Sequence, residues 1–144
     1  MIQWLGIANL FCCFFLTGLI WVIQLLHYPS FSFVGADKFA SFHAFHSLRI
    51  SMIVMPTMTL ELISSATLLY AERNRFWFSQ SVLVLFIWLC TAFLSVPIHN
   101  RLAFAANQSL MDRLVLTNWP RTLFWSARSL SMLYWLSSRL IVAK

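Results

Sequence analysis

Charged side chains are scarce in this sequence. Only 10% of its 144 residues are Asp, Glu, Lys or Arg, and only four of these are acidic. A soluble domain carries about 25% charged residues, whereas 60% of this chain is hydrophobic and 17% is aromatic. This composition excludes an ordinary soluble globular domain and predicts a protein of the lipid bilayer.

Glycine and cysteine are also few. The three glycines leave no glycine-rich loop that could cradle a phosphate group. Cys12, Cys13 and Cys90 all lie in apolar stretches and form no CxxC pair, so we expect them to pack as small hydrophobic residues rather than to bind zinc or form disulfides. No arrangement of Ser, His and Asp typical of a hydrolase is readable.

The positive charges do not indicate a nucleic-acid partner. The formal net charge is +6, but the basic residues stand singly at the ends of apolar stretches and form no basic stripe of the kind that nucleic-acid binding needs. We interpret them as arginines and lysines that flank membrane spans. No nucleic-acid partner is expected.

Four long apolar stretches make up most of the chain. They cover residues 2–26, 50–70, 76–96 and 122–142, and each approaches the roughly 20 residues that a helix needs to cross a bilayer. Because lipid offers no hydrogen-bond partners, each span should be an α-helix. The sequence therefore predicts one all-α domain over residues 1–144, an integral membrane four-helix bundle with short interfacial helices in the first and third loops.

Three prolines refine this prediction. Pro29 should end the first helix and Pro56 should kink the second, because a proline ring conflicts with the preceding helical turn. Apolar residues between 101 and 117 recur at helical spacing, which predicts an interfacial helix there. Pro120 is then suited to the first turn of the fourth helix.

All four histidines are expected at one end of the bundle. His43 and His46 are three residues apart and share a helix face. Antiparallel helices joined by short loops bring His27 and His99 to the same end. An ionisable stripe next to a membrane span is costly unless it faces a protein interior, so it indicates a functional site.

One hypothesis is a metal or haem site. Imidazole binds copper, iron and zinc, so His27, His43, His46 and His99 are the candidate metal ligands. Side chains around them would orient the rings; the candidates for this role are Gln24, Asn100 and Asn118.

A second hypothesis uses the arginines to bind an anionic or quinone-like ligand. Cationic and aromatic side chains would line its pocket, namely Arg49, Arg101, Arg121, Arg128, Trp119 and Trp125. Glu61 would pair with Arg128 beneath this pocket. Either site is compatible with oxidoreductase or oxygenase chemistry.

A third hypothesis is acid–base catalysis without a metal. His43 or His46 would move a proton while arginines stabilise an oxyanion, which makes His43, His46, Arg49 and Arg121 the candidate catalytic residues. The alternative from a different class is a non-enzymatic membrane protein that binds lipid or a partner helix, with histidines that only hold the helices together.

The sequence also indicates orientation and assembly. If the arginines of the site are set aside, fewer positive charges remain at the histidine end, which places both termini in the cytoplasm and the histidines near the outer face. Faces rich in Ala, Ser and Cys could pack against a second copy of the chain. A homo-oligomer is therefore one candidate assembly.

Several runs resemble a known group of proteins. They are His27-Tyr28-Pro29, Phe42-His43-Ala-Phe45-His46-Ser-Leu-Arg49, Val54-Met-Pro56 with Glu61-Leu62, Pro97-Ile-His99 and Thr117-Asn118-Trp119-Pro-Arg121 with Trp125-Ser-Ala-Arg128. Over nearly the whole chain they resemble small bacterial four-helix membrane proteins of uncharacterised function. The layout is more distantly similar to the anthrone-oxygenase-like membrane family. This resemblance implies a redox or oxygenase role and a bacterial inner-membrane location, and carries over no functional residue.

Overall fold

The protein is built from helices throughout the part that the structure describes. The computed structural model describes the backbone of residues 2–142 and the side chains of residues 2–139, and it contains no strand in this range. The elements are, in order, α1 (Ile2–Val22), η1 (Ile23–His27), η2 (Pro29–Phe33), α2 (Ala36–Glu72), α3 (Arg75–Cys90), η3 (Thr91–Ser95), α4 (Val96–Leu102) and α5 (Gln108–Val142). This confirms the predicted all-helical class.

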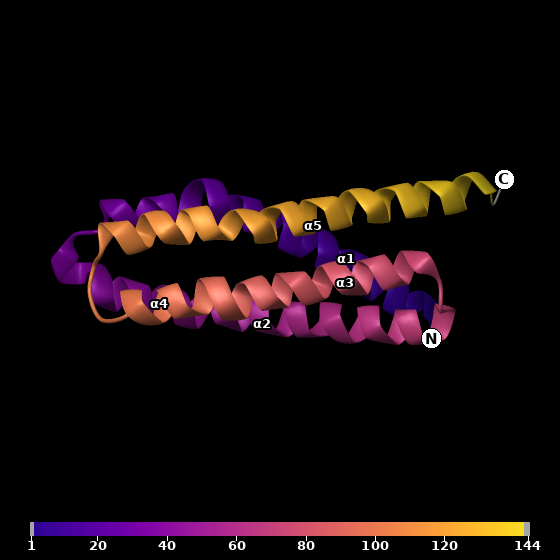
Figure 1. Ribbon diagram of the computed structural model, residues 1–144, viewed down its shortest axis with the longest axis horizontal. Helices are drawn as coiled ribbons and strands as arrows, with labels where there is room; N and C mark the ends of the chain where they lie inside the picture. Colours follow the sequence, from indigo (N-terminus) through magenta and orange to yellow (C-terminus); the bar gives the residue numbers. More distant parts are fainter. Residues whose placement is uncertain (1, 143–144) are drawn as a thin grey trace.

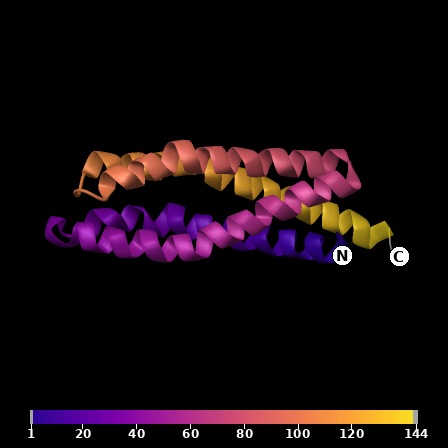
Figure 2. The same ribbon diagram turned by 90° about the horizontal axis from the view of Figure 1, so that it is seen from below.

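The long helices α1, α2, α3 and α5 lie side by side (Figures 1 and 2). α1 contacts α2 and α5, and α3 contacts the same two helices. α1 begins and α5 ends at one end of the molecule, while η2 and the turn between α4 and α5 lie at the other (Figure 1). We call the second end the histidine end, because it carries all four histidines.

Three helical stretches are long and apolar enough to cross a membrane: Ile2–Phe33, Ala36–Glu72 and Arg75–Leu102. The predicted fourth span, residues 122–142, is not among them within the described chain. The reason is its composition, since α5 carries Arg128, Arg139 and several serines. Two of these polar residues, Arg128 and Ser129, are buried inside the molecule rather than exposed.

The second helix is longer than predicted. No separate interfacial helix precedes the span within the described residues; α2 runs without a break for 37 residues and includes both His43 and His46. Pro56 lies inside α2, and Figure 2 shows the helix bending part-way along its length, as the conflict between a proline ring and the preceding turn requires. Only the short 3₁₀ turn η2 lies in the first loop.

The third loop also differs from the prediction. α4 ends at Leu102, and α5 begins at Gln108 and continues through Pro120. The predicted interfacial helix is therefore the first part of α5, and Pro120 does not start a helix. The first turns of α5 are held by Met111 and Leu114, which are buried in the main hydrophobic core. Their burial favours one continuous helix over a helix–break–helix.

Two π-helical turns lie toward the histidine end. η1 and η3 are π-helical, and each comes shortly before a proline, Pro29 and Pro97 respectively. A π turn shifts the hydrogen-bond ladder by one residue, which accommodates a proline that cannot donate. Single π turns occur frequently at functional sites. Here η1 contains His27, and η3 leads into the helix that carries His99.

Candidate functional site

The four imidazoles and one phenol gather into what we call the histidine cluster, which consists of His27, His43, His46, His99 and Tyr28. His27 Nε2 lies 2.7 Å from His46 Nδ1, and His43 Nε2 lies 3.1 Å from His99 Nδ1. The Tyr28 hydroxyl lies 3.0 Å from His99 Nε2. The rings thus come from η1 and the residue after it, from the first turns of α2 and from α4, and their centres lie as close as 4.3 Å.

Phenylalanine rings cover the histidine cluster from the loop side. Phe31 of η2 is fully buried and meets His27 and His46 edge-on, with ring centres 5.3 and 5.2 Å apart. Phe39 is also fully buried and stacks on His43 at 5.8 Å. These contacts leave His43 only 2% and His46 only 6% exposed. The cluster is therefore part of the packed interior rather than of the surface.

Two ring nitrogens in the cluster lack a partner. His43 Nδ1 and His46 Nε2 are buried and form no hydrogen bond to any described residue. The other nitrogen of each ring is already used within the cluster. A buried polar atom left unpaired costs about 1–3 kcal/mol, so such atoms in a native structure need an explanation, and a bound molecule is one.

Each of these two histidines lines a cavity. The first, which we call the polar cavity, measures about 360 Å³ and is lined by His43, Ala44, Ser47, Ile50, Ser51, Val96, His99, Asn100 and Ala103. The second, which we call the lipid-side groove, measures about 320 Å³ and is lined by Leu19, Val22, Ile23, Leu26, His27, Phe42, Phe45, His46, Arg49, Ile50 and Ile53. The cluster thus lies between a groove formed by α1, η1 and α2 and a cavity formed by α2 and α4.

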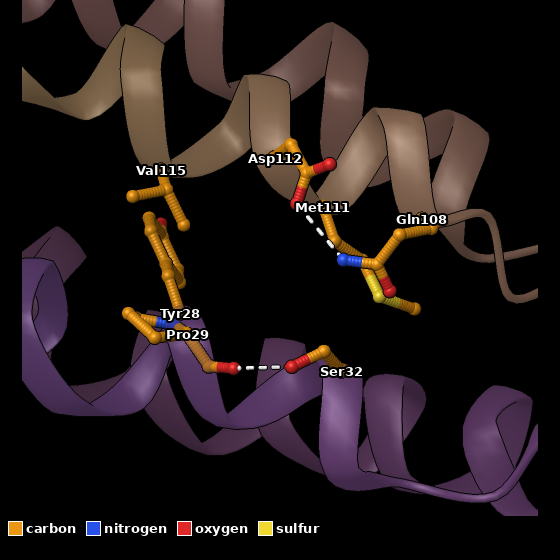
Figure 3. Close-up of a pocket in the computed structure, with 7 residues that line it drawn as sticks. All are labelled: Tyr28, Pro29, Ser32, Gln108, Met111, Asp112 and Val115. Atoms are coloured by element: carbon orange, nitrogen blue, oxygen red, sulfur yellow. Dashed lines mark hydrogen bonds between the residues drawn. The ribbon is translucent and has the colours of Figure 1, made fainter.

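A third cavity, of about 320 Å³, lies between η2 and the start of α5. Figure 3 shows Tyr28, Pro29 and Ser32 on one side and Gln108, Met111, Asp112 and Val115 on the other. The Gln108 amide donates to Asp112, and the Ser32 hydroxyl donates to the Pro29 carbonyl (Figure 3). Because these polar groups are already paired, this cavity offers less to a ligand than the two beside the cluster.

Arg121 lies directly beneath the cluster. Its guanidinium is 4% exposed, donates to Ser95 Oγ at 2.7 Å and lies over the Trp125 ring at 5.6 Å. It also lies beside the Tyr28 hydroxyl. In the described chain its guanidinium meets no carboxylate, since the single ion pair found there joins two other residues. The site therefore contains a buried positive charge that is not neutralised.

A second polar network lies deeper in the bundle. Arg128 forms a buried ion pair with Glu61, which also accepts a hydrogen bond from Trp125 Nε1 at 3.2 Å. Arg128 donates further to Asn9 Oδ1 at 2.8 Å and to Ser65 Oγ at 3.0 Å. The predicted pairing of Glu61 with Arg128 is confirmed, and it joins α1, α2 and α5 at one point.

Two residues predicted to orient the imidazoles do not contact them. Gln24 Oε1 accepts from Asn118 Nδ2 at 2.8 Å, and Gln24 Nε2 donates to the Val115 carbonyl at 3.1 Å. Gln24 and Asn118 therefore connect η1 to α5, and that prediction is wrong for both. Asn100, the third residue of this prediction, is exposed and lines the polar cavity. Tyr28 is the side chain that contacts His99.

The predicted arginine pocket is not assembled. Arg49 is exposed and lies over the Phe45 ring at 5.4 Å, and Arg101 is exposed at the end of α4. Trp119 is 37% exposed and meets Trp21 edge-on. Helix periodicity placed these residues at the correct end, but the side chains of Arg49, Arg101 and Trp119 are exposed. Arg121 and Arg128 instead have partners inside the bundle.

Metal-binding geometry is not formed in the described residues: no three His, Cys, Asp or Glu side chains are arranged to hold one ion. The imidazole nitrogens instead meet as two separate pairs. Cys12, Cys13 and Cys90 are free thiols, and the first two are buried, as the sequence predicts.

Several residues of the two networks were missed by sequence reasoning. Tyr28 directly follows His27 in the sequence, and this position next to a predicted site residue could have indicated that it lies at the site. Asn9 and Ser65 lie in apolar stretches, and no sequence spacing connects a residue of the first helix to one 56 positions later. Ser47, whose Oγ is buried without a partner among the described residues, was not among the predicted site residues.

Comparison with known proteins gives no relative: no family model, no curated protein and no solved structure matches this chain.

Proposed function

We propose that this protein is an integral membrane four-helix bundle that binds a small, membrane-soluble, quinone-like molecule in the lipid-side groove. The observation that supports this most is the unpartnered Nε2 of His46, a buried polar atom on a residue that lines an otherwise apolar groove. A carbonyl or hydroxyl on a hydrophobic molecule would satisfy this atom, and the body of the molecule would fill the groove.

The membrane location is supported by where the apolar side chains lie. Large hydrophobic residues are exposed along the helices, among them Phe11 at 66%, Leu26 at 68% and Phe93 at 71%. Exposed apolar surface on this scale is costly in water and favourable in lipid. We include α5 as the fourth span because Arg128, its most deeply placed charge, is neutralised by Glu61. A bacterial inner membrane with cytoplasmic termini remains part of this proposal.

The groove is suited to a molecule that arrives from the bilayer. Val22, Leu26 and Ile53 line it and are more than 45% exposed, so in a membrane they would border lipid. Arg49 lines it as well and is exposed over the Phe45 ring. A ligand with an alkyl or isoprenoid tail would keep that tail among lipid-facing residues while its polar head reaches His46.

The His27–His46 hydrogen bond suits a ligand with two chemical forms. A neutral imidazole has one donor and one acceptor nitrogen, so exchanging the tautomers of the pair turns His46 Nε2 from donor into acceptor. As a donor it would bind a quinone carbonyl, and as an acceptor it would bind a quinol hydroxyl. This two-way hydrogen bonding is the contribution of the chain to an oxidoreductase role.

A metal ion bound by imidazoles is the second candidate, and the spacing of the paired nitrogens is compatible with it. Two nitrogens bound to one ion at about 2.0–2.1 Å lie about 2.9–3.4 Å apart, and His43 Nε2 and His99 Nδ1 are 3.1 Å apart. Four ligands on one ion would require the two pairs to rotate toward a common point. Copper, iron and zinc are the metals that imidazole suits.

The test is a binding titration with decylubiquinone on the purified protein in lipid nanodiscs, followed by isothermal calorimetry. We expect saturable binding at one molecule per chain and at least a tenfold loss of affinity in His46→Ala. Ser41→Ala is the matched control, since Ser41 is exposed on the same helix and bonds only to the Lys38 carbonyl. Equal affinity in wild type and His46→Ala would overturn the proposal.

Elemental analysis of the same preparation tests the second candidate. Stoichiometric copper, iron or zinc that is lost in a His43→Ala/His99→Ala variant would support a metal site. Metal-free protein that still binds decylubiquinone would support the groove ligand instead.

A further inference from the structure

The polar cavity contains two buried polar atoms that nothing in the described chain satisfies. They are His43 Nδ1 and Ser47 Oγ, on residues one helical turn apart that line the same cavity. The Asn100 side chain lines it from α4. Two unpaired atoms on residues that line one space of about 360 Å³ indicate a site for a hydrogen-bonding molecule, separate from the lipid-side groove.

The hydrogen-bond chain behind His43 determines which of its nitrogens carries the hydrogen. Arg121 lies beside the Tyr28 hydroxyl. A guanidinium can only donate, so its charge favours a Tyr28 oxygen that turns its lone pairs toward Arg121 and a hydroxyl that donates to His99 Nε2, 3.0 Å away. In that arrangement His99 Nδ1 carries hydrogen and donates to His43 Nε2. We therefore assign the hydrogen of neutral His43 to Nδ1. His43, which lines the polar cavity, then offers an N–H donor at Nδ1.

The charge around this cavity favours an anion. None of its lining residues is acidic, and Arg121 is buried without a carboxylate partner in the described chain. Hydrogen bonds that run in one direction polarise one another, so the guanidinium strengthens the donor at His43 Nδ1. A buried charge without a counter-charge is costly, and a bound anion at the end of this chain would reduce that cost.

We propose that the polar cavity is a second subsite, which binds a small carboxylate through the His43 Nδ1–H and Ser47 hydroxyl donors. The carboxylate oxygens accept both hydrogen bonds, and Ile50 and Val96 contact the apolar part of the molecule. Tyr28 acts as a positioning residue, since it fixes the His99 and His43 tautomers without lining this cavity. The subsite does not depend on what the lipid-side groove binds.

The probe is benzoate, titrated by calorimetry into the nanodisc-embedded protein, with neutral benzamide as its uncharged analogue. We expect benzoate to bind at least tenfold more tightly than benzamide. His43→Ala should lower benzoate affinity at least tenfold, and Ser47→Ala should lower it severalfold. Ser41→Ala, on the same helix but outside the cavity, should bind like wild type. Equal binding of benzoate and benzamide would overturn the assignment of a carboxylate.

Tyr28→Phe gives the distinguishing measurement. It removes the hydroxyl but nothing that lines the cavity, so benzoate affinity should fall about three- to tenfold. An unchanged benzoate affinity in Tyr28→Phe would contradict the hydrogen-bond chain. Absence of benzoate binding in protein that binds decylubiquinone would overturn this subsite and leave the groove proposal standing.

A measurement on unaltered protein covers the case in which a variant fails to fold. With ¹⁵N-labelled histidine, benzoate should shift the His43 Nδ1 resonance and leave those of His27 in place. A shift confined to His27 and His46 would place benzoate in the groove and overturn the proposal.

Discussion

The two buried polar networks of this bundle differ in how completely they are paired. In the deeper one, Glu61 and Arg128 meet each other and also Trp125, Asn9 and Ser65. Only Arg128 Nε lacks a partner there within the described chain. In the histidine cluster, two of the four rings carry an unpaired buried nitrogen, and cavities adjoin it on two sides.

This difference distinguishes the deep network, which holds helices together, from the histidine cluster, to which we assign a binding role. A polar network with satisfied hydrogen bonds gains rigidity and specificity from its low-dielectric surroundings, whereas a partly satisfied one carries a cost. In the deep network only Arg128 Nε is left without a partner among the described residues. The histidine cluster retains hydrogen-bonding capacity beside space that a molecule can enter, and that is the property expected of a site.

The largest effect should follow from breaking the deep ion pair. Glu61→Ala leaves the Arg128 guanidinium buried and uncompensated, and removing one partner of a buried pair costs about 3–5 kcal/mol. Thermal unfolding in detergent, followed by circular dichroism, measures the loss. The double variant Glu61→Leu/Arg128→Met should recover most of it, because it removes both charges; failure to recover would show that the pair does more than hold the helices.

A smaller loss should follow from Asn118→Ala. This change removes one hydrogen bond between η1 and α5 and leaves Gln24 Oε1 with only the weaker contact to Thr122 at 3.4 Å. We expect the free energy of unfolding to fall by about 1–2 kcal/mol in the same thermal unfolding measurement. Decylubiquinone and benzoate affinities should be unchanged, and a tenfold loss of either would return Asn118 to the binding site.

His46→Phe should have little effect on stability and a large effect on binding. The variant loses one hydrogen bond to His27 but also removes an unpaired buried nitrogen, and the two effects oppose each other, so we expect a net change below about 1 kcal/mol. Decylubiquinone affinity should fall at least tenfold. A destabilisation as large as that of Glu61→Ala would show that the two networks do not differ in the way proposed.

The smallest effect is expected for Trp119→Phe. Trp119 is partly exposed and contacts Trp21 rather than the histidine cluster, so the change in stability should stay within about 0.5 kcal/mol. The histidine ¹⁵N resonances should not move. A shift of those resonances would place Trp119 near the site after all.

The sequence predicted which end of the molecule a residue lies at better than which way its side chain faces. Counting helices and loops is enough to bring His27, His43, His46 and His99 to one end, and they do gather there. Helical spacing also placed Glu61 and Arg128 at related depths, and they pair. Both results depend on distance along helices, which a fixed rise per residue determines.

Predictions that needed the rotation of one helix against another were less successful. Arg49, Arg101 and Trp119 were placed at the correct end, but they point to the exterior. The π turns η1 and η3 each shift the phase of the residues that follow, and no periodicity computed for a regular α-helix includes that shift. The continuous α5 through Pro120 was missed because its first turns are stabilised by burial of Met111 and Leu114 rather than by local signals.

The amino-acid sequence by itself determined that the chain is helical, apolar enough to enter a membrane and polar at one end, because composition and spacing act locally along each helix. Only the tertiary structure decided which nitrogen faces which, that Tyr28 and Arg121 stand behind His99, and that two imidazole nitrogens remain unpaired beside cavities. Hydrogen-bond pairing depends on ångström-scale distances and on the relative rotation of packed helices, and a linear pattern contains neither.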